Sequence, residues 1–524
     1  MPTASTTRTV DDDGLDQLRR PRTDLLTERS AGPDAWTMDE GPFRHYRRTL
    51  QVSPTAAGRH RVTERIEFSL AVPLWKVLIN PLMKRALRSA DRRTRRRWWW
   101  PAQLVDQRTA TMVGVLSTIG VVTGYLGVMI GQTITFAAAD FGRGDAAQAN
   151  TLAAVRIGVL LPVLLLPRAD RLGRRPLILA FATTAIAFTV VGAAAPDLEI
   201  LGLTQTVARG LTTGLITLLV VASTEEVPSG ARAFTISILT MATALGAGMV
   251  LWVLPVADVV DGGWRIVYAA AAVFLPLVWW VGRQLPETRR FAAATTHEAP
   301  GRIEWGRFVL LGTTAFVSAM FFSPASQLRN EFLRDDLGYT AASVSLFQLI
   351  ISAPAGTAIL VSGILADRIG RRRIASISLA VGGTMLALSY QLTGPGLWLT
   401  ASVGVVLTGA AIPATRGYSS ELFPTRSRAR VGGLLDGVGV AGSAAGLVLV
   451  GQLSERWDDL GRAIGLMVVA PLVVAAIIAI RFPETASTEL EAFNPDDPVM
   501  PGPGGGRSEP VTGPGSGASR PRRP

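Results

Sequence analysis

Two arginines, Arg156 and Arg209, are the residues of this chain best suited to bind a charged solute in apolar surroundings. Each lies near the middle of a long hydrophobic segment, where a charge costs about 2.5–3.5 kcal/mol on insertion scales. The neighbouring apolar segments contain no aspartate or glutamate at the same depth. Because a guanidinium there needs a counter-ion, a bound carboxylate or phosphate compound could supply it. The alternative is that one or both arginines donate to carbonyl groups at interrupted helices.

Other polar residues in the apolar segments are few. Gln348 could contribute to the same substrate site or face lipid. Asp436 is the only acid inside a predicted span; it could carry a proton, or pair with Arg416 or with arginines of the other half, and we favour the pairing. The chain has no cysteine and only three histidines, all outside the apolar segments. We therefore predict no catalytic residues, no metal site and no cofactor.

The elements that position these side chains must cross a bilayer. Hydrophobic residues make up 48% of the 524 residues, and the apolar runs have the 17 to 25 residues that a spanning helix needs. They are continuous rather than alternating, which favours helices over a barrel. The predicted spans are 109–131, 148–166, 177–195, 200–222, 233–256, 265–284, 307–327, 341–362, 374–392, 396–417, 431–450 and 462–481.

The loops between these segments repeat. The sequence Ala-Asp-Arg-Leu-Gly-Arg-Arg at 169–175 returns 197 residues later at 366–372, with isoleucine in place of leucine. Two further patterns, Glu-x-x-Pro-x-x-x-Arg from Glu225 and from Glu421, and Pro-Glu-Thr at 286–288 and 483–485, recur at nearly the same interval. Repetition of several features at one interval indicates a duplication, here of a six-segment half.

The repeated loops resemble those of the major facilitator superfamily, over roughly residues 109–485. The second copy matches the motif G-x-L-A-D-R-x-G-R-R throughout, whereas the first has Leu166 at the position of the leading glycine. The Glu-x-x-Pro-x-x-x-Arg and Pro-Glu-Thr sequences are similar to those of the sugar porter and organic acid porter branch. The resemblance implies an all-α membrane protein of 12 transmembrane helices in two pseudo-symmetric six-helix bundles that rock around a central site.

Carboxylates and arginines recur together in these loops, which predicts a network that closes one face of the membrane region. The alternative is that they are orientation charges only, since surface pairs contribute about 0–1 kcal/mol each. The residues concerned are Asp170, Arg171, Gly173, Arg174, Arg175, Glu225, Arg232 and Glu287 in the first half, and Gly363, Asp367, Arg368, Gly370, Arg371, Arg372, Glu421, Arg428 and Glu484 in the second.

The charge distribution predicts orientation and domain limits. Seventeen arginines flank the spans on the side of the N-terminus and six on the other, which places both termini in the cytoplasm of a cell-membrane protein. We expect an N-terminal extension (1–108), a first bundle (109–284), a linker (285–305), a second bundle (306–482) and a disordered tail (483–524). In the extension, 1–40 should be disordered, 43–72 a weak hairpin, and 74–87 a segment along the membrane surface.

These features predict a secondary active transporter of a small organic anion or sugar-like solute, coupled to an ion gradient, with protons as the candidate ion. The basic collar around residues 92–100 should bind anionic lipids, and no nucleic acid is needed to explain the net charge of +12. We expect a monomer and no enzymatic activity. No ATP-binding loop occurs, which disfavours primary active transport and an ATPase. The alternatives are a drug efflux antiporter and, from another class, a non-transporting membrane sensor.

Overall fold

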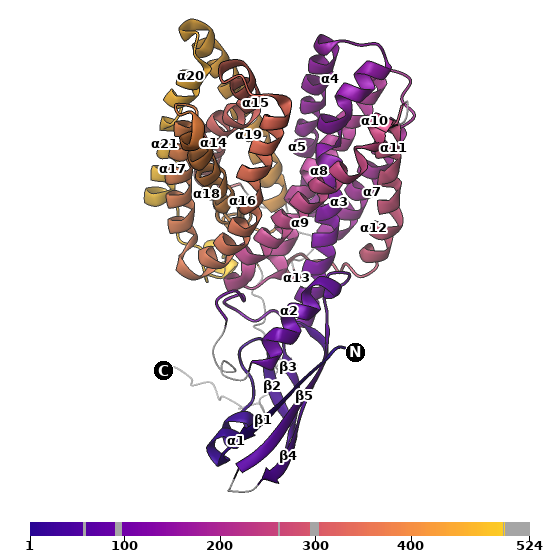
Figure 1. Ribbon diagram of the computed structural model, residues 1–524, viewed down its shortest axis with the longest axis vertical. Helices are drawn as coiled ribbons and strands as arrows, with labels where there is room; N and C mark the ends of the chain where they lie inside the picture. Colours follow the sequence, from indigo (N-terminus) through magenta and orange to yellow (C-terminus); the bar gives the residue numbers. More distant parts are fainter. Residues whose placement is uncertain (56–58, 90–96, 260–261, 294–302, 496, 498–524) are drawn as a thin grey trace, which may run out of the picture.

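The protein consists of two helical bundles and a small β-domain at one end of them, as the computed structural model shows (Figure 1). The first and second bundles lie beside each other, and the β-domain lies below the first helix of the chain's membrane region. The structure describes the chain apart from residues 56–58, 90–96, 260–261, 294–302, 496 and 498–524.

The first bundle contains six spans, of which the second and sixth are built from consecutive short helices. Pro162 and Pro167 lie where the second span changes between α and 3-10 geometry, as expected where a backbone donor is missing. The elements are α3 (Gln107–Asp140), α4 (Asp145–Ile157), η1 (Gly158–Leu160), α5 (Leu161–Leu165), η2 (Leu166–Arg168), α6 (Ala169–Leu172), α7 (Arg174–Gly192), α8 (Leu198–Glu226), η3 (Ser229–Ala231), α9 (Arg232–Val253), α10 (Val256–Val259), α11 (Trp264–Ala269), η4 (Ala270–Val273) and α12 (Phe274–Gly282).

The second bundle repeats this order after a linker that contains one short helix. Its elements are α13 (Arg289–Ala293) in the linker, then α14 (Trp305–Gln327), α15 (Arg329–Glu331), η5 (Phe332–Asp336), α16 (Ala341–Ile369), α17 (Arg371–Ser389), α18 (Gly394–Glu421), α19 (Arg428–Trp457), α20 (Leu460–Leu466), α21 (Val469–Arg481) and α22 (Leu490–Phe493).

Eleven segments among the described helices are long and apolar enough to cross a membrane. The remaining predicted span, 374–392, corresponds to α17, whose arginine-rich first turn lowers its mean hydropathy. The prediction of 12 helices in two bundles is confirmed. Most core residues pack against residues of their own bundle, but Ala429 of the second bundle packs into the core of the first. Ala233 of the first bundle packs into the core of the second.

The N-terminal extension is a folded domain. Its five strands form one antiparallel sheet in the order β1-β5-β4-β3-β2. The helices α1 (Asp12–Arg19) and α2 (Lys76–Arg88) contribute buried leucine, methionine and alanine side chains to its two small cores. The strands are β1 (Thr3–Val10), β2 (Thr27–Gly32), β3 (Ala35–Glu40), β4 (Phe43–Thr55) and β5 (Arg59–Leu70).

The prediction that residues 1–40 are disordered was wrong, whereas the hairpin predicted over 43–72 corresponds to β4 and β5. Much of the order depends on partners distant in sequence, because β1 pairs with β5 from Thr3 opposite Glu67 onward. The charged side chains of the extension suggested a chain exposed to solvent, but several of them are buried. Arg48 lies 2.7 Å from Glu28, and both side chains are inaccessible to solvent.

The expected disorder of the tail from 483 to 524 was also wrong for its first part. Residues 483–495 and Asp497 are ordered and include α22. This segment stays against the bundles because its carboxylates meet arginines that are buried under the motif loops. The remainder of the predicted tail, 498–524, lies outside the described residues.

Candidate functional site

Arg156 links the two bundles near the middle of the second span. It lies in the last turn of α4, and its guanidinium donates to the Oε1 atom of Gln327 at the end of α14. The amide nitrogen of Gln327 donates in turn to the Ser323 hydroxyl at 2.5 Å, and Ser323 contacts Ser443 of α19. The side chains of Arg156 and Gln327 are exposed in the structure.

Arg209 lies on α8, where close packing brings it near Arg156. A Cβ atom at Gly210 would lie 2.3 Å from the carbonyl oxygen of Gly158, so α8 and the end of α4 touch through their backbones. The two guanidinium groups are close enough to repel each other. Among the described residues, none is recorded as a hydrogen-bond or ion-pair partner of the half-buried Arg209 side chain. Arg209 therefore presents an unneutralised positive charge between membrane helices.

The third residue expected at this site, Gln348, is not joined to the arginines. Its amide donates to Asn330 in α15 at 2.8 Å. Gln327 occupies the position next to Arg156 instead, and sequence reasoning missed it because a glutamine in the last turn of a span has no distinctive pattern. Its only signal was its place near Pro324 at the end of an apolar segment.

Asp436 lies at a contact between the bundles. Its carboxylate accepts a hydrogen bond from the Thr217 hydroxyl of α8 at 2.5 Å. The guanidinium of Arg416, from α18, lies 3.6 Å away. Asp436 thus has one partner in its own bundle, Arg416, and one in the other bundle, Thr217. A change in the charge of Asp436 would therefore affect the contact between the two bundles.

The repeated loops meet at one end of the bundles, here called the motif face and defined by residues 166–175, 225–232, 363–373 and 421–430. Asp170 accepts from the backbone nitrogens of Ala429 and Arg430, at 3.2 and 2.9 Å. Asp367 accepts in the same way from the first turn of α9, Ala233 and Phe234, at 3.1 and 2.8 Å. Each motif aspartate therefore caps a helix of the opposite bundle, where a negative charge is favoured.

Glu225 is the most heavily shared carboxylate at the motif face. It lies 2.9 Å from Arg174 of its own bundle and 3.0 Å from Arg428 of the other, and it accepts from the Thr288 hydroxyl at 2.7 Å. Glu225 and both arginines have no solvent-accessible side-chain surface. Desolvated charges of this kind hold together only while all partners are present.

Glu421 takes the equivalent position in the second half. It contacts Arg371 of its own bundle and lies 3.9 Å from Arg232 of the other. Arg174 and Arg371 also reach across to backbone carbonyl oxygens of the opposite bundle, at Thr425 and Ser229. The network is therefore duplicated, with its two copies facing each other across the interface.

The Pro-Glu-Thr carboxylates fix the turns before α7 and α17. Glu287 accepts from the backbone nitrogens of Arg174 and Arg175, and Glu484 accepts from those of Arg371 and Arg372. The residues just before these helices, Gly173 and Gly370, have φ of 103° and 122°. A Cβ atom would lie 2.3 Å from Glu287 at the first and 2.5 Å from Glu484 at the second, so only glycine fits.

The leading glycine of the motif is replaced in the first half, yet the close contact there is retained. A Cβ atom at Gly363 of α16 would lie 2.7 Å from the carbonyl oxygen of Ala233 in α9. Leu166 is fully buried, and its side chain packs onto Gly433 of α19. In the first half, the small residue at this contact is therefore Gly433 on the facing helix α19 and not a glycine at position 166.

Three of the predicted network arginines, Arg171, Arg175 and Arg372, have exposed side chains. Arg368 is also exposed but contacts the segment that follows the β-domain, donating to the carbonyl oxygens of Arg97 and Trp100 at 2.7 and 2.9 Å. Further along this segment, Gln103 accepts from the backbone nitrogen of Gly230 at 3.0 Å. The segment thereby contacts both bundles at the motif face.

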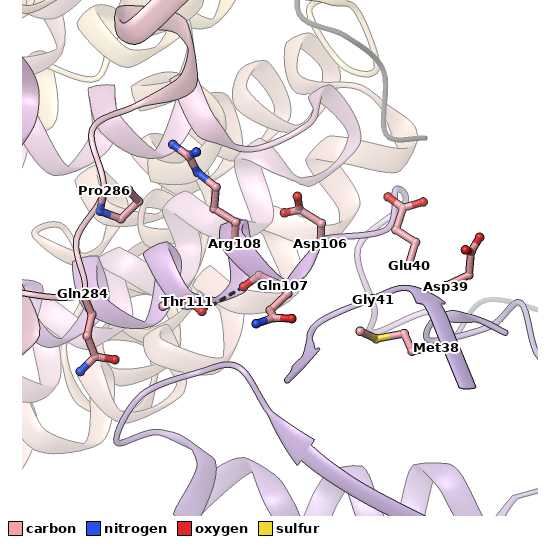
Figure 2. Close-up of a pocket in the computed structure, with 10 residues that line it drawn as sticks. All are labelled: Met38, Asp39, Glu40, Gly41, Asp106, Gln107, Arg108, Thr111, Gln284 and Pro286. Atoms are coloured by element: carbon pink, nitrogen blue, oxygen red, sulfur yellow. Dashed lines mark hydrogen bonds between the residues drawn. The ribbon is translucent and has the colours of Figure 1, made fainter. Parts of the chain in front are cut away.

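A cavity of about 490 Å³ separates the β-domain from the start of α3. Figure 2 shows the turn after β3, the first turn of α3 and the chain before α13 around it. Asp106, one of its lining residues, caps α3 through the backbone nitrogen of Thr109 and pairs with Arg289. Burial by itself would raise the pKa of Asp106, but these contacts hold the pKa below its ordinary value. The cavity lies away from Arg156 and Arg209, in a different layer of the molecule.

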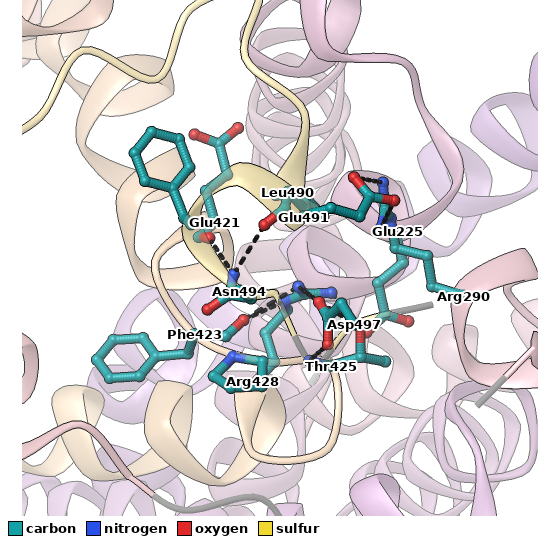
Figure 3. A network of polar contacts seen from close by, with 12 residues as sticks. Glu225, Arg290, Glu421, Phe423, Thr425, Arg428, Leu490, Glu491, Asn494 and Asp497 are labelled. Carbon is teal, nitrogen blue, oxygen red and sulfur yellow. Dashed lines mark hydrogen bonds and ion pairs between the residues drawn. The ribbon is translucent and has the colours of Figure 1, made fainter. Parts of the chain in front are cut away.

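The ordered tail crosses the motif face, as Figure 3 shows. Asn494 donates to the carbonyl oxygen of Glu421 at 2.9 Å, and Asp497 accepts from the backbone nitrogen of Thr425 at 2.8 Å. Three carboxylates of the tail contact arginines of both bundles and of the linker: Glu489 with Arg232 at 3.2 Å, Glu491 with Arg290 at 2.7 Å, and Asp497 with Arg428 at 3.2 Å. The tail thus adds contacts to both copies of the network.

Two duplicated six-helix bundles, joined at one face by paired motif loops and carrying cationic side chains between them, define a multi-pass membrane protein. Residues 308–508 match the family model described as the Major Facilitator Superfamily. The solved structure of the proton:xylose symporter XylE matches over 73% of this chain and 98% of its own, with a TM-score of 0.64 and 16% identity. The resemblance to this superfamily is therefore confirmed, by sequence in the second half and by fold across the membrane region.

Two curated relatives are also similar to the chain. The probable 4-methylmuconolactone transporter of Cupriavidus pinatubonensis is 25% identical over 248 residues, 45% of this chain and 58% of the relative. The citrate-proton symporter of Klebsiella pneumoniae is 28% identical over 190 residues, 32% of this chain and 40% of the relative. The chain therefore spans about half the length of these relatives. Both are named as transporters and not as enzymes.

Proposed function

We propose that this protein is a secondary active transporter that carries a small organic anion across the membrane by alternating access. The observation that supports this most is Arg209, a cation between membrane helices without a described carboxylate partner. With Arg156 and Gln327 beside it, the centre offers several N–H donors to a carboxylate. An anion there would offset the repulsion between the two arginines.

The comparisons favour the same solute class. Two of the relatives are named for 4-methylmuconolactone and citrate, and a third for xylose. A neutral sugar has no need of two arginines. Citrate is a carboxylate, and a muconolactone keeps one free carboxylate after the other carboxyl has formed the lactone, so both could pair with arginine. We therefore place organic acids ahead of neutral sugars as substrates, and no observation reported above favours drug efflux or a purely sensory role.

The conformation fits one end state of such a cycle. The ion pairs between bundles described above gather at the motif face, and the contact of Arg156 with Gln327 lies deeper in the membrane region. We propose that the motif face is cytoplasmic, because arginines are concentrated there, so that this state is closed to the cytoplasm. Both termini then lie in the cytoplasm of a plasma-membrane protein that works as a monomer. The basic collar, of which residues 92–96 lie outside the described residues, would contact anionic lipid.

Replacing Arg209 by glutamine tests the proposed site. In proteoliposomes, the Arg209→Gln variant should lose at least about tenfold of its uptake of organic anions, because a charge-assisted hydrogen bond contributes about 1.5–3 kcal/mol. Arg209→Lys should retain part of the activity, because it keeps the charge but loses the planar pair of donors. Uptake of labelled citrate, succinate and neutral sugars should be measured with each variant.

Arg283 provides the matched control. It is an exposed arginine that stacks on Trp279, with its guanidinium carbon 3.4 Å from the ring centroid, at the end of α12. Arg283→Gln should therefore leave anion uptake unchanged. Equal anion transport by wild type and Arg209→Gln, or transport of neutral sugars alone, would overturn the proposed cationic site.

Asp436 is our candidate for coupling transport to protons. In the protonated form its carboxyl would no longer attract Arg416, so the contact through Thr217 would depend on protonation. We expect Asp436→Asn to remove the stimulation of uptake by an inward pH gradient while exchange of labelled for unlabelled solute continues. The two assays should be run on the same vesicles. If the variant responds to the gradient like wild type, Asp436 serves only as the partner of Arg416.

A further inference from the structure

The helix α2 of the β-domain has two apolar sides. Met83, Ala86 and Leu87 are buried against the sheet. On the other side, three large apolar side chains are exposed by 66 to 73%: Val77, Leu78 and Leu82. Their spacing puts them on one stripe of the helix. Leu74, in the turn just before the helix, is 43% exposed. Nothing in the described chain covers this stripe, and a soluble domain rarely leaves such a row uncovered.

Hydrogen bonds fix the start of α2 against the first membrane span. The indole nitrogen of Trp75 donates to the carbonyl oxygen of Gly114 and lies 3.1 Å from the Thr118 hydroxyl. These two residues lie about 10 and 16 Å along the axis of α3 from its first residue. The 34 residues of α3 extend over about 51 Å, well beyond the roughly 30 Å of a hydrocarbon core. A core centred on α3 would begin about 10 Å from its first residue, which is the level of Gly114 and its contact with Trp75.

Cations flank the apolar stripe. Lys76, Arg85 and Arg88 are exposed on α2, and Trp98, which follows in the next segment, is 62% exposed. Figure 1 shows α2 between the sheet and the bundles. An apolar stripe with cations beside it and an aromatic side chain nearby is typical of a helix that lies in the headgroup region of a bilayer.

We propose that α2 is an interfacial membrane anchor that binds the anionic lipid surface at the motif face through its stripe of Val77, Leu78 and Leu82, together with Leu74 in the turn before it. Lipid is favoured over a protein partner because the stripe continues directly from a contact with a membrane-spanning helix. The surrounding cations match anionic headgroups. The anchor holds the β-domain, and with it the segment that contacts Arg368, at a fixed distance from the membrane.

The absence of cysteine from the sequence makes a direct test simple. The full chain carrying Leu78→Cys is labelled with an environment-sensitive fluorophore and placed in vesicles that contain anionic lipid. We expect a blue-shifted emission that is quenched when brominated lipids replace part of the bilayer. Gln51→Cys, exposed on β4 within the sheet, is the control and should show water-like emission without quenching.

Further measurements separate lipid from other occupants. The combined variant Lys76→Gln, Arg85→Gln and Arg88→Gln should weaken the dependence of quenching on anionic lipid content and leave the fold, followed by circular dichroism, unchanged. A label at Leu78→Cys that stays water-like and escapes brominated lipid overturns the proposal. So does a blue shift that depends on protein density and not on lipid bromination, because it would show contact between copies of the chain.

Discussion

The Glu225→Gln variant is expected to lose net transport and to destabilise the closed motif face. The substitution leaves Arg174 and Arg428 buried at 2.9 and 3.0 Å from a neutral amide, without their shared negative charge. Removing one partner of a buried ion pair costs about 3–5 kcal/mol. That loss would move a two-state equilibrium by roughly two to four orders of magnitude. The bundles should therefore separate at this face.

A single cysteine can report the separation. Ala429 is fully buried, and it packs into the core of the opposite bundle, so it becomes accessible only when the bundles part. In the Ala429→Cys background, Glu225→Gln should increase labelling by a maleimide added on the motif side. The control is Glu304→Gln, which removes an exposed pair with Arg307 at 3.5 Å and should change little. Unchanged labelling in Glu225→Gln would show that the carboxylate does not close this face.

Glu421→Gln offers an internal comparison, because the two halves are similar but not identical. The arginine of the opposite bundle, Arg232, lies 3.9 Å from Glu421. It also has a second carboxylate in Glu489 at 3.2 Å. We therefore expect the same direction of change as for Glu225→Gln but a smaller one.

Sequence reasoning predicted the motif face better than the centre of the membrane region. Asp170 and Asp367 stand in loops that repeat almost letter for letter, so a shared role could be inferred from spacing. The spacing could not show that each of these aspartates caps a helix of the opposite bundle. That geometry depends on how the bundles dock, and the docking is set by contacts between residues more than 130 positions apart.

The β-domain, the ordered part of the tail and the role of Gln327 were not predicted, and here too the cause is contact between residues distant in sequence. The β-domain was overlooked because its pairing of β1 with β5 joins residues about 60 positions apart, and because Arg48 and Glu28 satisfy each other out of solvent. The tail was overlooked because a proline- and glycine-rich composition hides a few carboxylates whose partners are buried arginines. Gln327 carries no pattern, and only the approach of α14 to α4 gives it a role beside Arg156.

At the contact between the two bundles, Gly363 is expected to tolerate no larger residue. A Cβ atom there would lie 2.6 Å from the Ser237 hydroxyl and 2.7 Å from a backbone oxygen of α9, and a backbone atom cannot move aside as a side chain can. Gly363→Leu should therefore hold α16 away from α9, prevent closure of the motif face, and abolish uptake. Labelling of the Ala429→Cys reporter should rise as it does in Glu225→Gln.

The same helix supplies the control, because a Cβ atom at Gly356 would meet nothing within 4 Å. Gly356→Leu should fold and keep the reporter protected, which separates a general effect of leucine in α16 from a steric block at the contact. The first half shows why the contact and not the glycine itself matters, since Leu166 is accommodated there by Gly433 on the facing helix. If Gly363→Leu leaves the reporter protected, α16 and α9 do not need to touch for the motif face to close, and the duplicated contact would be a matter of packing alone.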